Sequence, residues 1–221
     1  PSLDSAVAVN NCRNEKMASA PRYVTCNLCG ADDYNVVFPK GYAQLHRIVR
    51  CNRCSLMYAN PQESVDADMF EDPSQQPNLD TPGYQRYLEK QHVQIADNLR
   101  VLETLNELTP KRGKLLEIGS YLGIFLDRVR AAGWDVTGLE PVAFPAKYAR
   151  EKFGLNIIED ILPNANFPDA AFDSVIMLHV IEHLPDPGEM LREIRRIMKP
   201  GGVLVVETPR FDSLMFKMLG R

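Results

Sequence analysis

Short apolar runs and amphipathic segments alternate along the second half of the chain. Mostly apolar runs with the length and β-branching of buried strands occupy residues 115–118, 136–139, 156–158, 174–178 and 203–206. Apolar side chains at helical spacing fill most of the intervals, over residues 124–132, 144–153 and 187–198. A longer amphipathic helix is predicted before the first run, over residues 83–108. Strands that alternate with helices in this way predict an α/β fold with a doubly wound parallel sheet.

A glycine turn joins the first predicted strand to the helix after it. Gly119 ends the apolar run and Gly123 opens the helix, so the backbone there can approach a ligand without a Cβ in the way. The next strand ends at Glu140, about 20 residues past the turn, where a carboxylate can accept hydrogen bonds from both hydroxyls of a ribose. Glu117 would be a poor neighbour for the diphosphate of a dinucleotide, but it suits a cofactor that carries positive charge. The pattern therefore predicts an adenosine-type cofactor.

Two stretches of the chain resemble the class I S-adenosylmethionine (SAM) methyltransferases. Residues 117–123 resemble motif I of that family, usually written D/E-x-G-x-G-x-G, with Tyr121 in place of the middle glycine. Residues 172–208, with the sequences EHLPDP and KPGG, resemble the family's region from the fourth to the fifth strand. The resemblance implies a Rossmann-like fold, SAM as cofactor and a methyl transfer reaction. It also implies a sixth and a seventh strand, which the sequence does not contain before residue 221, so we expect it to be truncated.

The resemblance assigns cofactor contacts to side chains at the carboxyl ends of the predicted strands. Glu140 would bind the ribose hydroxyls, and Asp160 with Ile161 would meet the adenine. Glu117 and the glycine turn would face the methionine portion, and we expect Tyr121 to line the cleft rather than turn toward the covering helix. The complete predicted set is Glu117, Gly119, Ser120, Tyr121, Gly123, Glu140, Pro141, Asp160, Ile161, Leu178 and His179.

Two histidines follow the fourth predicted strand, in the sequence LHVIEHL. Methyl transfer from a sulfonium is an in-line displacement, so a general base is needed only where the acceptor must lose a proton. His183 is the candidate base, with a structural hydrogen-bonding role as the alternative. His179, with Leu178, would by the resemblance border the adenosine or the sulfonium. The four-residue spacing predicts that both histidines lie on one side of a helical turn, and it differs from the H-E-x-x-H order of zinc proteases.

Four of the five cysteines form two C-x-x-C pairs, which are 21 residues apart: Cys26 with Cys29, and Cys51 with Cys54. This spacing is typical of a zinc ribbon, in which each pair offers two thiolates to one tetrahedral ion. Two disulfides or a redox C-x-x-C are the alternatives. Disulfides fit poorly with a cytosolic enzyme, and a redox pair usually opens a helix. Four thiolates leave no place for a catalytic water, so the predicted Zn²⁺ is structural.

These patterns divide the chain into four parts. Residues 1–21 lack a hydrophobic signal core and predict a flexible tail, and residues 22–60 predict the zinc ribbon. Residues 61–82 are rich in proline and polar side chains and predict a linker. Residues 83–221 predict the methyltransferase core.

Composition bears on the partners of this enzyme. A net charge of −4 does not favour nucleic acid as a partner, and no apolar run reaches the ~20 residues that span a bilayer. A ribbon before this core resembles a bacterial group that includes sugar and polysaccharide methyltransferases. That resemblance implies a cytoplasmic enzyme acting on a small molecule or a glycan, at oxygen. Two alternatives stay open: an RNA methyltransferase whose basic ribbon reads RNA, and a non-catalytic partner subunit with a decayed SAM site at Tyr121. Nothing in the sequence indicates an oligomeric state.

Overall fold

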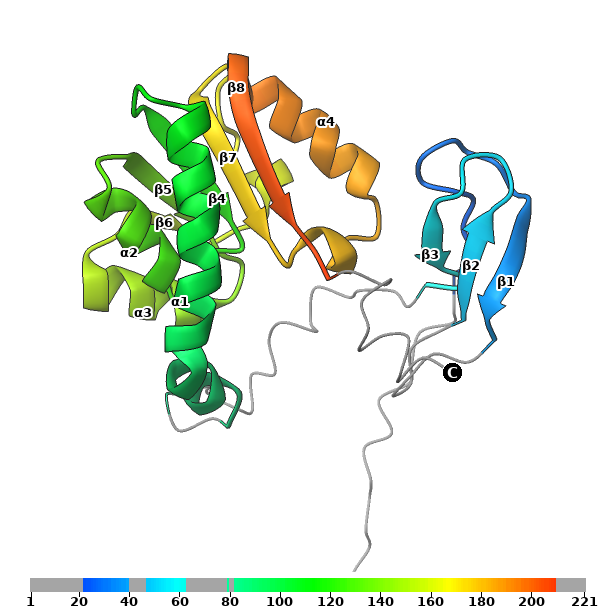
Figure 1. Cartoon of the computed structure of the whole chain (residues 1–221), viewed down its shortest axis with the longest axis horizontal. Coiled ribbons are helices and arrows are strands. Elements are labelled where there is room, and N and C mark those ends of the chain that lie inside the picture. The colour runs from blue at the N-terminus through cyan, green and yellow to red at the C-terminus, as the bar shows by residue number, and fades with distance from the viewer. Residues whose placement is uncertain (1–21, 40–46, 63–78, 80–81, 210–221) are drawn as a thin grey trace, which may run out of the picture.

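The computed structural model describes residues 22–39, 47–62, 79 and 82–209, apart from the side chains of residues 82–83 and 91–97 (Figure 1). The predicted tail, most of the predicted linker and residues 210–221 lie outside these ranges. The described strands form two sheets, one of three strands and one of five. No helix in the described ranges is both long enough and apolar enough to cross a membrane.

The smaller sheet is antiparallel and follows the first cysteine pair. Its strands β1 (Tyr34–Phe38), β2 (Ile48–Cys51) and β3 (Met57–Ala59) pair in chain order. Its small core contains the buried side chains of Cys26, Val49, Cys51 and Tyr58. The buried amide of Asn60 also exchanges two hydrogen bonds of 3.1 Å with the backbone of Val24, which fastens the first knuckle to the end of β3.

The larger sheet is parallel and has the strand order β6-β5-β4-β7-β8. Its strands are β4 (Lys114–Ile118), β5 (Asp135–Leu139), β6 (Ile157–Ile158), β7 (Phe172–Leu178) and β8 (Met198–Glu207). Strand order runs outward in one direction from β4 to β6, and in the other from β7 to β8. This reversal beside β4 defines a doubly wound, Rossmann-like sheet and confirms the predicted fold class.

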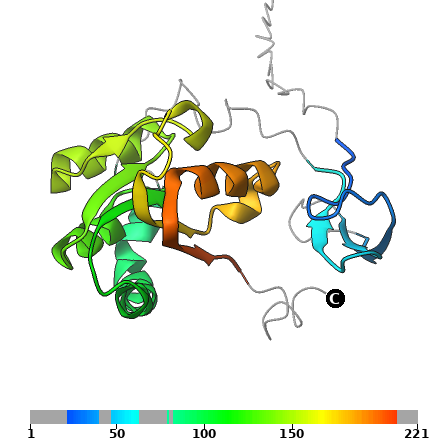
Figure 2. The same ribbon diagram turned by 90° about the horizontal axis from the view of Figure 1, so that it is seen from above.

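Helices cover both faces of the larger sheet. Residues alternate along each strand between the two faces, so Leu115 and Ile176 belong to one core cluster and Leu116 and Val175 to the other. The first cluster packs against α1 (Pro82–Leu108), α2 (Ile124–Ala131) and α3 (Ala143–Phe153), and the second against α4 (Pro187–Ile197). Figure 2 looks along α1 and shows α4 on the other side of β8.

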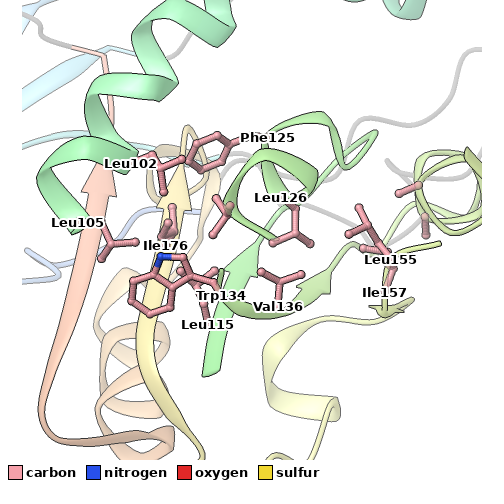
Figure 3. Packing of buried hydrophobic residues seen from close by; sticks show 13 residues of the cluster. Leu102, Leu105, Leu115, Phe125, Leu126, Trp134, Val136, Leu155, Ile157 and Ile176 are labelled. Atoms are coloured by element: carbon pink, nitrogen blue, oxygen red, sulfur yellow. The ribbon is translucent and has the colours of Figure 1, made fainter. Parts of the chain in front are cut away.

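One of these clusters lies beneath α1 (Figure 3). Leu102 and Leu105 of α1 reach down beside Phe125 of α2, and Trp134 lies against them with its indole N–H donating to Asn106 at 3.1 Å. Leu99, which the helical spacing placed on the same apolar face, is 40% exposed instead. Leu88, near the start of the helix, is half-buried, so Leu99 alone departs from the predicted face among the side chains that the structure describes.

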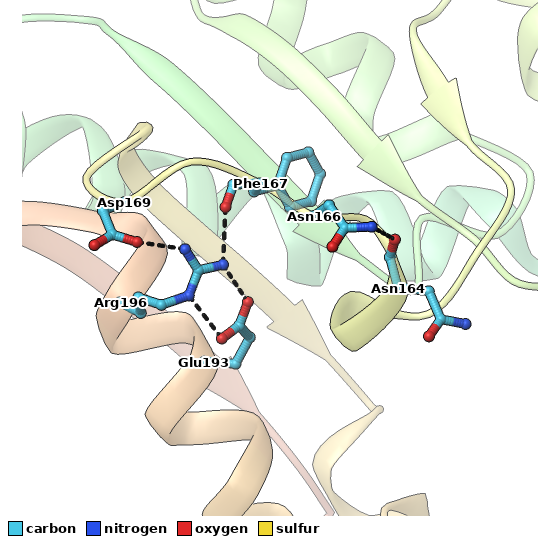
Figure 4. Close-up of polar contacts among 6 residues, drawn as sticks. All are labelled: Asn164, Asn166, Phe167, Asp169, Glu193 and Arg196. Carbon is cyan, nitrogen blue, oxygen red and sulfur yellow. Dashed lines mark hydrogen bonds and ion pairs between the residues drawn. The ribbon is translucent and has the colours of Figure 1, made fainter.

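Arg196 fixes α4 to the segment that precedes β7 (Figure 4). Its guanidinium pairs with Asp169, donates to Glu193 at 2.9 Å and donates to the carbonyl of Phe167 at 2.8 Å. Asp186 caps the first turn of α4 by accepting from the N–H of Glu189 at 2.9 Å.

The end of α4 differs from its prediction in two respects. The helix ends at Ile197, and the KPGG sequence belongs to β8, where Gly201 has a left-handed φ of 80°. A register shift lets this segment join the sheet beside Phe172 and Ser174. The helical spacing places Leu191 on one face with Ile194 and Ile197, but Leu191 is 39% exposed, whereas Ile194 and Ile197 are buried.

Candidate functional site

The predicted cofactor residues meet at one edge of the larger sheet. Glu117 lies near the end of β4, Glu140 directly follows β5, and Asp160 follows β6. Leu178 ends β7 and His179 follows it. Since parallel strands end at the same edge, these residues surround the point where strand order reverses, which is where open α/β sheets bind ligands. The N-terminal end of α1 reaches the same edge (Figure 1).

The glycine turn after β4 has three left-handed residues, Gly119, Tyr121 and Gly123, with φ angles of 73°, 47° and 73°. The glycines are also required by packing. A Cβ at Gly119 would lie 2.6 Å from the Val180 side chain, and one at Gly123 would lie 2.7 Å from Cβ of Ala149. The turn is therefore held tightly between the end of β7 and α3.

Tyr121 takes a conformation that favours glycine, at the place where motif I of the family has glycine. Its backbone N–H donates to Glu140 at 2.8 Å. Its ring packs on two tyrosines of α1, with centroid distances of 5.4 Å to Tyr84 and 4.7 Å to Tyr87. The ring therefore turns toward the covering helix α1, which the expectation had given as the alternative to lining the cleft, and the role of the ring at the cofactor edge stays a prediction.

Glu140 is a buried carboxylate held by two backbone N–H groups. Its oxygens accept from the N–H of Tyr121 at 2.8 Å and from the N–H of Val142 at 2.9 Å. Burial raises the pKa of this carboxyl group, and the two hydrogen bonds oppose that rise. A carboxylate offers about four lone-pair sites, so two remain for further donors such as hydroxyl groups.

Glu117 is buried with one oxygen, Oε2, that has no hydrogen-bond partner in the described part of the chain. Burial raises the pKa of this group well above its usual value, and the nearby Glu140 raises it further. The hydroxyl of Ser120, in the glycine turn, is buried and unpartnered in the same way. An unpaired buried carboxylate is costly unless a cation or a donor completes it. The two acids Glu117 and Glu140 thus fit SAM, which carries an ammonium and a sulfonium charge beside a ribose.

Asp160 and Ile161 lie at the far side of the same edge. One oxygen of Asp160 accepts from the N–H of Ile161 at 2.7 Å and from the side chain of Asn164 at 2.9 Å. These two bonds span the start of the short helix η3 (Leu162–Asn164). The Ile161 side chain is 48% exposed and offers an apolar surface beside the strand end.

His179 does not share a helical turn with His183, so that expectation is corrected. His179 has a left-handed φ of 55°, and the short helix η4 (Ile181–His183) begins two residues later. The ring of His179 lies between two carboxylates, with Nδ1 at 3.6 Å from Glu182 and Nε2 at 3.3 Å from Glu207. His183 is exposed in η4.

Four residues of this edge are absent from the sequence prediction: Tyr84, Tyr87, Glu182 and Glu207. The two tyrosines stand three residues apart at the start of a predicted helix, a spacing that places them on one face. That signal could have marked them as a pair, but not as neighbours of the glycine turn.

The four paired cysteines form a second candidate site. Their Sγ atoms all lie within 4.8 Å of one another, with 3.4 Å between Cys26 and Cys54 and 3.6 Å between Cys29 and Cys51. All four are free thiols, so no disulfide joins them. A tetrahedral ion with 2.3 Å bonds to sulfur holds its ligands ~3.8 Å apart, so the cluster has the dimensions of a zinc site.

The two cysteine knuckles repeat the same backbone pattern. The N–H of Gly30 donates to the backbone carbonyl of Cys26 at 2.8 Å, and the N–H of Ser55 donates to the backbone carbonyl of Cys51 at 3.0 Å. Gly30 and Ser55, one residue after each pair, are both left-handed, with φ angles of 71° and 66°. Each knuckle thus turns its two thiols toward the same point.

Comparison with known families agrees with this geometry. A family model described as a methyltransferase domain matches residues 84–219, which is more than half of the chain. The chain therefore belongs to this family, and its larger part is a class I SAM-dependent methyltransferase domain. The resemblance seen in motif I and in the EHLPDP region is thereby confirmed.

Individual relatives match part of the chain. The chain is similar to ubiquinone biosynthesis O-methyltransferases of Actinobacillus pleuropneumoniae, at 33% identity over 105 residues, and of Caulobacter vibrioides, at 35% over 104. The alignments cover 43% and 42% of this chain and 45% and 40% of the relatives, so the chain spans under half the length of these relatives.

Solved structures show the same fold. A SAM-dependent methyltransferase of Thermotoga maritima, described as a possible histamine N-methyltransferase, superposes with a TM-score of 0.50 at 29% identity. That match covers 61% of this chain and 62% of the other. DesVI of Streptomyces venezuelae superposes with a TM-score of 0.52 at 18% identity, over 62% of this chain and 60% of the other.

Proposed function

We propose that this protein transfers the methyl group of SAM to an oxygen atom of a small-molecule acceptor. The observation that carries the proposal is the unpaired, buried carboxylate of Glu117 beside the glycine turn. A cation bound beside this group would stabilise its ionised form and offset the cost of burial, and SAM is the cationic cofactor of this family. The names of the O-methyltransferase relatives support oxygen as the acceptor atom.

The cofactor contacts follow the predicted residue set. Glu140 accepts from the ribose hydroxyls, and Asp160 with Ile161 meets the adenine. Glu117 binds the ammonium of the methionine portion, and the turn from Gly119 through Ser120 to Gly123 lies beside it. Pro141 lies between Glu140 and Val142 in the same segment, while Leu178 and His179 border the site from the end of β7.

The bound cofactor supplies an activated methyl group, and the chain's own residues position the acceptor and take its proton. His183 is the proposed base, because it is exposed just beyond the end of β7 and can accept a proton from a hydroxyl acceptor. His179, held between Glu182 and Glu207, orients the start of the same segment. Replacing His183 with alanine should lower kcat by roughly 100-fold or more while the Kd for SAM stays unchanged. An unchanged kcat would assign His183 a structural role.

The cysteine cluster is proposed to hold one structural Zn²⁺ in a ribbon module over residues 22–60. The thiol distances and the repeated knuckle backbone support this proposal. Residues 61–82 would then act as a linker to the methyltransferase core, which begins at residue 83. The tail over residues 1–21 and the cytoplasmic location remain predictions, as does the glycan acceptor.

Calorimetric titration of the full chain with SAM tests the enzyme proposal. We expect binding of wild type and a loss of at least tenfold in affinity for Glu117→Gln, because one charge-assisted contact is removed. Absence of binding at millimolar SAM would favour the non-catalytic partner subunit. Product analysis by mass spectrometry, with phenolic, sugar and RNA acceptors in parallel, then separates the small-molecule reading from the glycan and RNA alternatives.

A further inference from the structure

Three tyrosine rings and a phenylalanine form one aromatic cluster at the cofactor edge. Tyr84 and Tyr87 belong to the first turns of α1, Tyr121 to the glycine turn, and Phe144 to the start of α3. The ring of Tyr121 packs on both α1 tyrosines, and Tyr84 also meets Phe144 at 4.8 Å between centroids. The cluster thus joins three segments that are distant in sequence.

This cluster lies beside the two buried acids. Tyr87 interacts electrostatically with Glu117, whereas Tyr84 and Tyr121 interact with Glu140. Burial raises the pKa of Tyr87 to about 12 and raises those of Tyr84 and Tyr121, so the rings stay neutral. Neither acid has a Lys or Arg partner among the described residues. Aromatic faces and carboxylates without a protein cation are the surroundings that a ligand cation prefers.

We propose that Tyr84, Tyr87 and Tyr121 form an aromatic wall that recognises the sulfonium charge of SAM and so distinguishes SAM from its neutral product, S-adenosylhomocysteine (SAH). The inference rests on the proposed function, since it concerns the same cofactor site. In SAM the sulfonium links the ribose to the methionine chain. Tyr121 is the ring that contacts both the tyrosine beside the ribose acid Glu140 and the tyrosine beside the ammonium acid Glu117.

The backbone of Tyr121 supports a role for its ring. Its N–H bond to Glu140 is a main-chain contact that glycine could make equally well. A tyrosine at a φ of 47° costs free energy that glycine would not. What tyrosine adds is therefore the ring alone, and the ring lies in the cluster beside the two acids. Selecting SAM over SAH would reduce inhibition by the product after each transfer.

Titration of the full chain with SAM and, separately, with SAH tests the proposal. Tyr121→Leu should weaken SAM binding by roughly 2- to 30-fold, the range expected for loss of a cation–π contact, while SAH binding changes less than about twofold. Tyr121→Phe keeps the ring and should bind both ligands within about twofold of wild type. Tyr87 lies in a helix, where leucine is readily accommodated. Tyr87→Leu therefore repeats the comparison of SAM and SAH binding without a change in the strained turn.

The two ligands separate the possible outcomes. An equal loss of SAM and SAH affinity in Tyr121→Leu and Tyr87→Leu would overturn the proposal, because the rings would then only pack. A loss in Tyr121→Phe as large as that in Tyr121→Leu would also overturn it, since the hydroxyl would be responsible. Failure of wild type to bind either ligand would instead overturn the proposed function. Tyr148→Leu is the matched control, because Tyr148 packs on Phe153 of α3 outside the cluster.

Discussion

The backbone N–H of Tyr121 donates a 2.8 Å hydrogen bond to the carboxylate of Glu140. This bond connects the turn after β4 to the end of β5, which are 19 residues apart in sequence. It means that the acid proposed to bind the ribose also holds the shape of the glycine turn. A substitution at Glu140 should therefore affect both the glycine turn after β4 and the end of β5.

Replacing Glu140 with glutamine should weaken SAM binding by at least tenfold. The amide keeps one acceptor oxygen, but its NH₂ group faces a backbone N–H that Glu140 now satisfies, and the charge-assisted bonds to ribose are lost. Calorimetry with SAM measures the change. Glu159→Gln is the control, since Glu159 pairs with Arg150 at the surface. Equal affinities for the two variants would contradict the role of Glu140.

The stability of the methyltransferase core should fall with rising pH because of Glu117. Its pKa is raised in the folded chain, so above pH 4.5 the unfolded chain releases a proton that the folded chain retains. The contribution of Glu117 to the free energy of unfolding is therefore present below pH 4.5 and is lost as pH rises toward the raised pKa. The slope is at most about 1.4 kcal/mol per pH unit.

Urea unfolding from pH 5 to 8, followed by fluorescence of the single tryptophan, Trp134, measures this slope. The variant Glu117→Gln lacks the titrating group and should lose less stability over the same range. Parallel curves for the two proteins would show that the Glu117 carboxyl group is not buried unpaired. Saturating SAM should flatten the wild-type curve, since a bound cation lowers the pKa of this carboxyl group.

Substitutions at two left-handed glycines can separate the cost of crowding around the glycine turn from the cost of backbone strain. Gly154 ends α3 with a φ of 63° and has open space where a Cβ would lie, whereas Gly123 has a φ of 73° and no room. We expect Gly154→Ala to cost about 1 kcal/mol of unfolding free energy. Gly123→Ala should cost about 1–3 kcal/mol more, because Ala149 and Leu155 must move. Equal losses of unfolding free energy in the two variants would mean that Ala149 and Leu155 can move aside without cost.

Removal of metal should unfold the smaller sheet and leave the larger one folded. One Zn²⁺ per chain is expected by elemental analysis, and Cys29→Ser should lower that content, whereas Cys12→Ser should not. After chelation, amide hydrogens of β2 and β3 should exchange rapidly, since their core is four buried side chains. The unfolding midpoint reported by Trp134 should stay the same. Slow exchange after chelation would show that the ribbon folds without metal.

The parts of the fold that follow from local pattern could be predicted from the sequence. The strands 136–139 and 174–178 lie within β5 and β7, and α3 ends at Gly154 as its left-handed glycine requires. The packing of the Tyr121 ring on α1 was not predicted, because it depends on Tyr84, which is distant in the sequence. The position of His179 was missed for a different reason. Its left-handed backbone brings the ring between Glu182 and Glu207, and no periodicity signals such a conformation.

Arg196 anchors only one half of α4 (Figure 4). The other half begins at Pro187, the last residue of the EHLPDP segment, exposes Leu191 and has no ion pair among the described residues. Sequence change on the exposed side of this N-terminal half of α4 should therefore cost the sheet little. The surface there can diverge between relatives while the buried acids Glu117 and Glu140 and the segment from His179 to Asp186 stay the same.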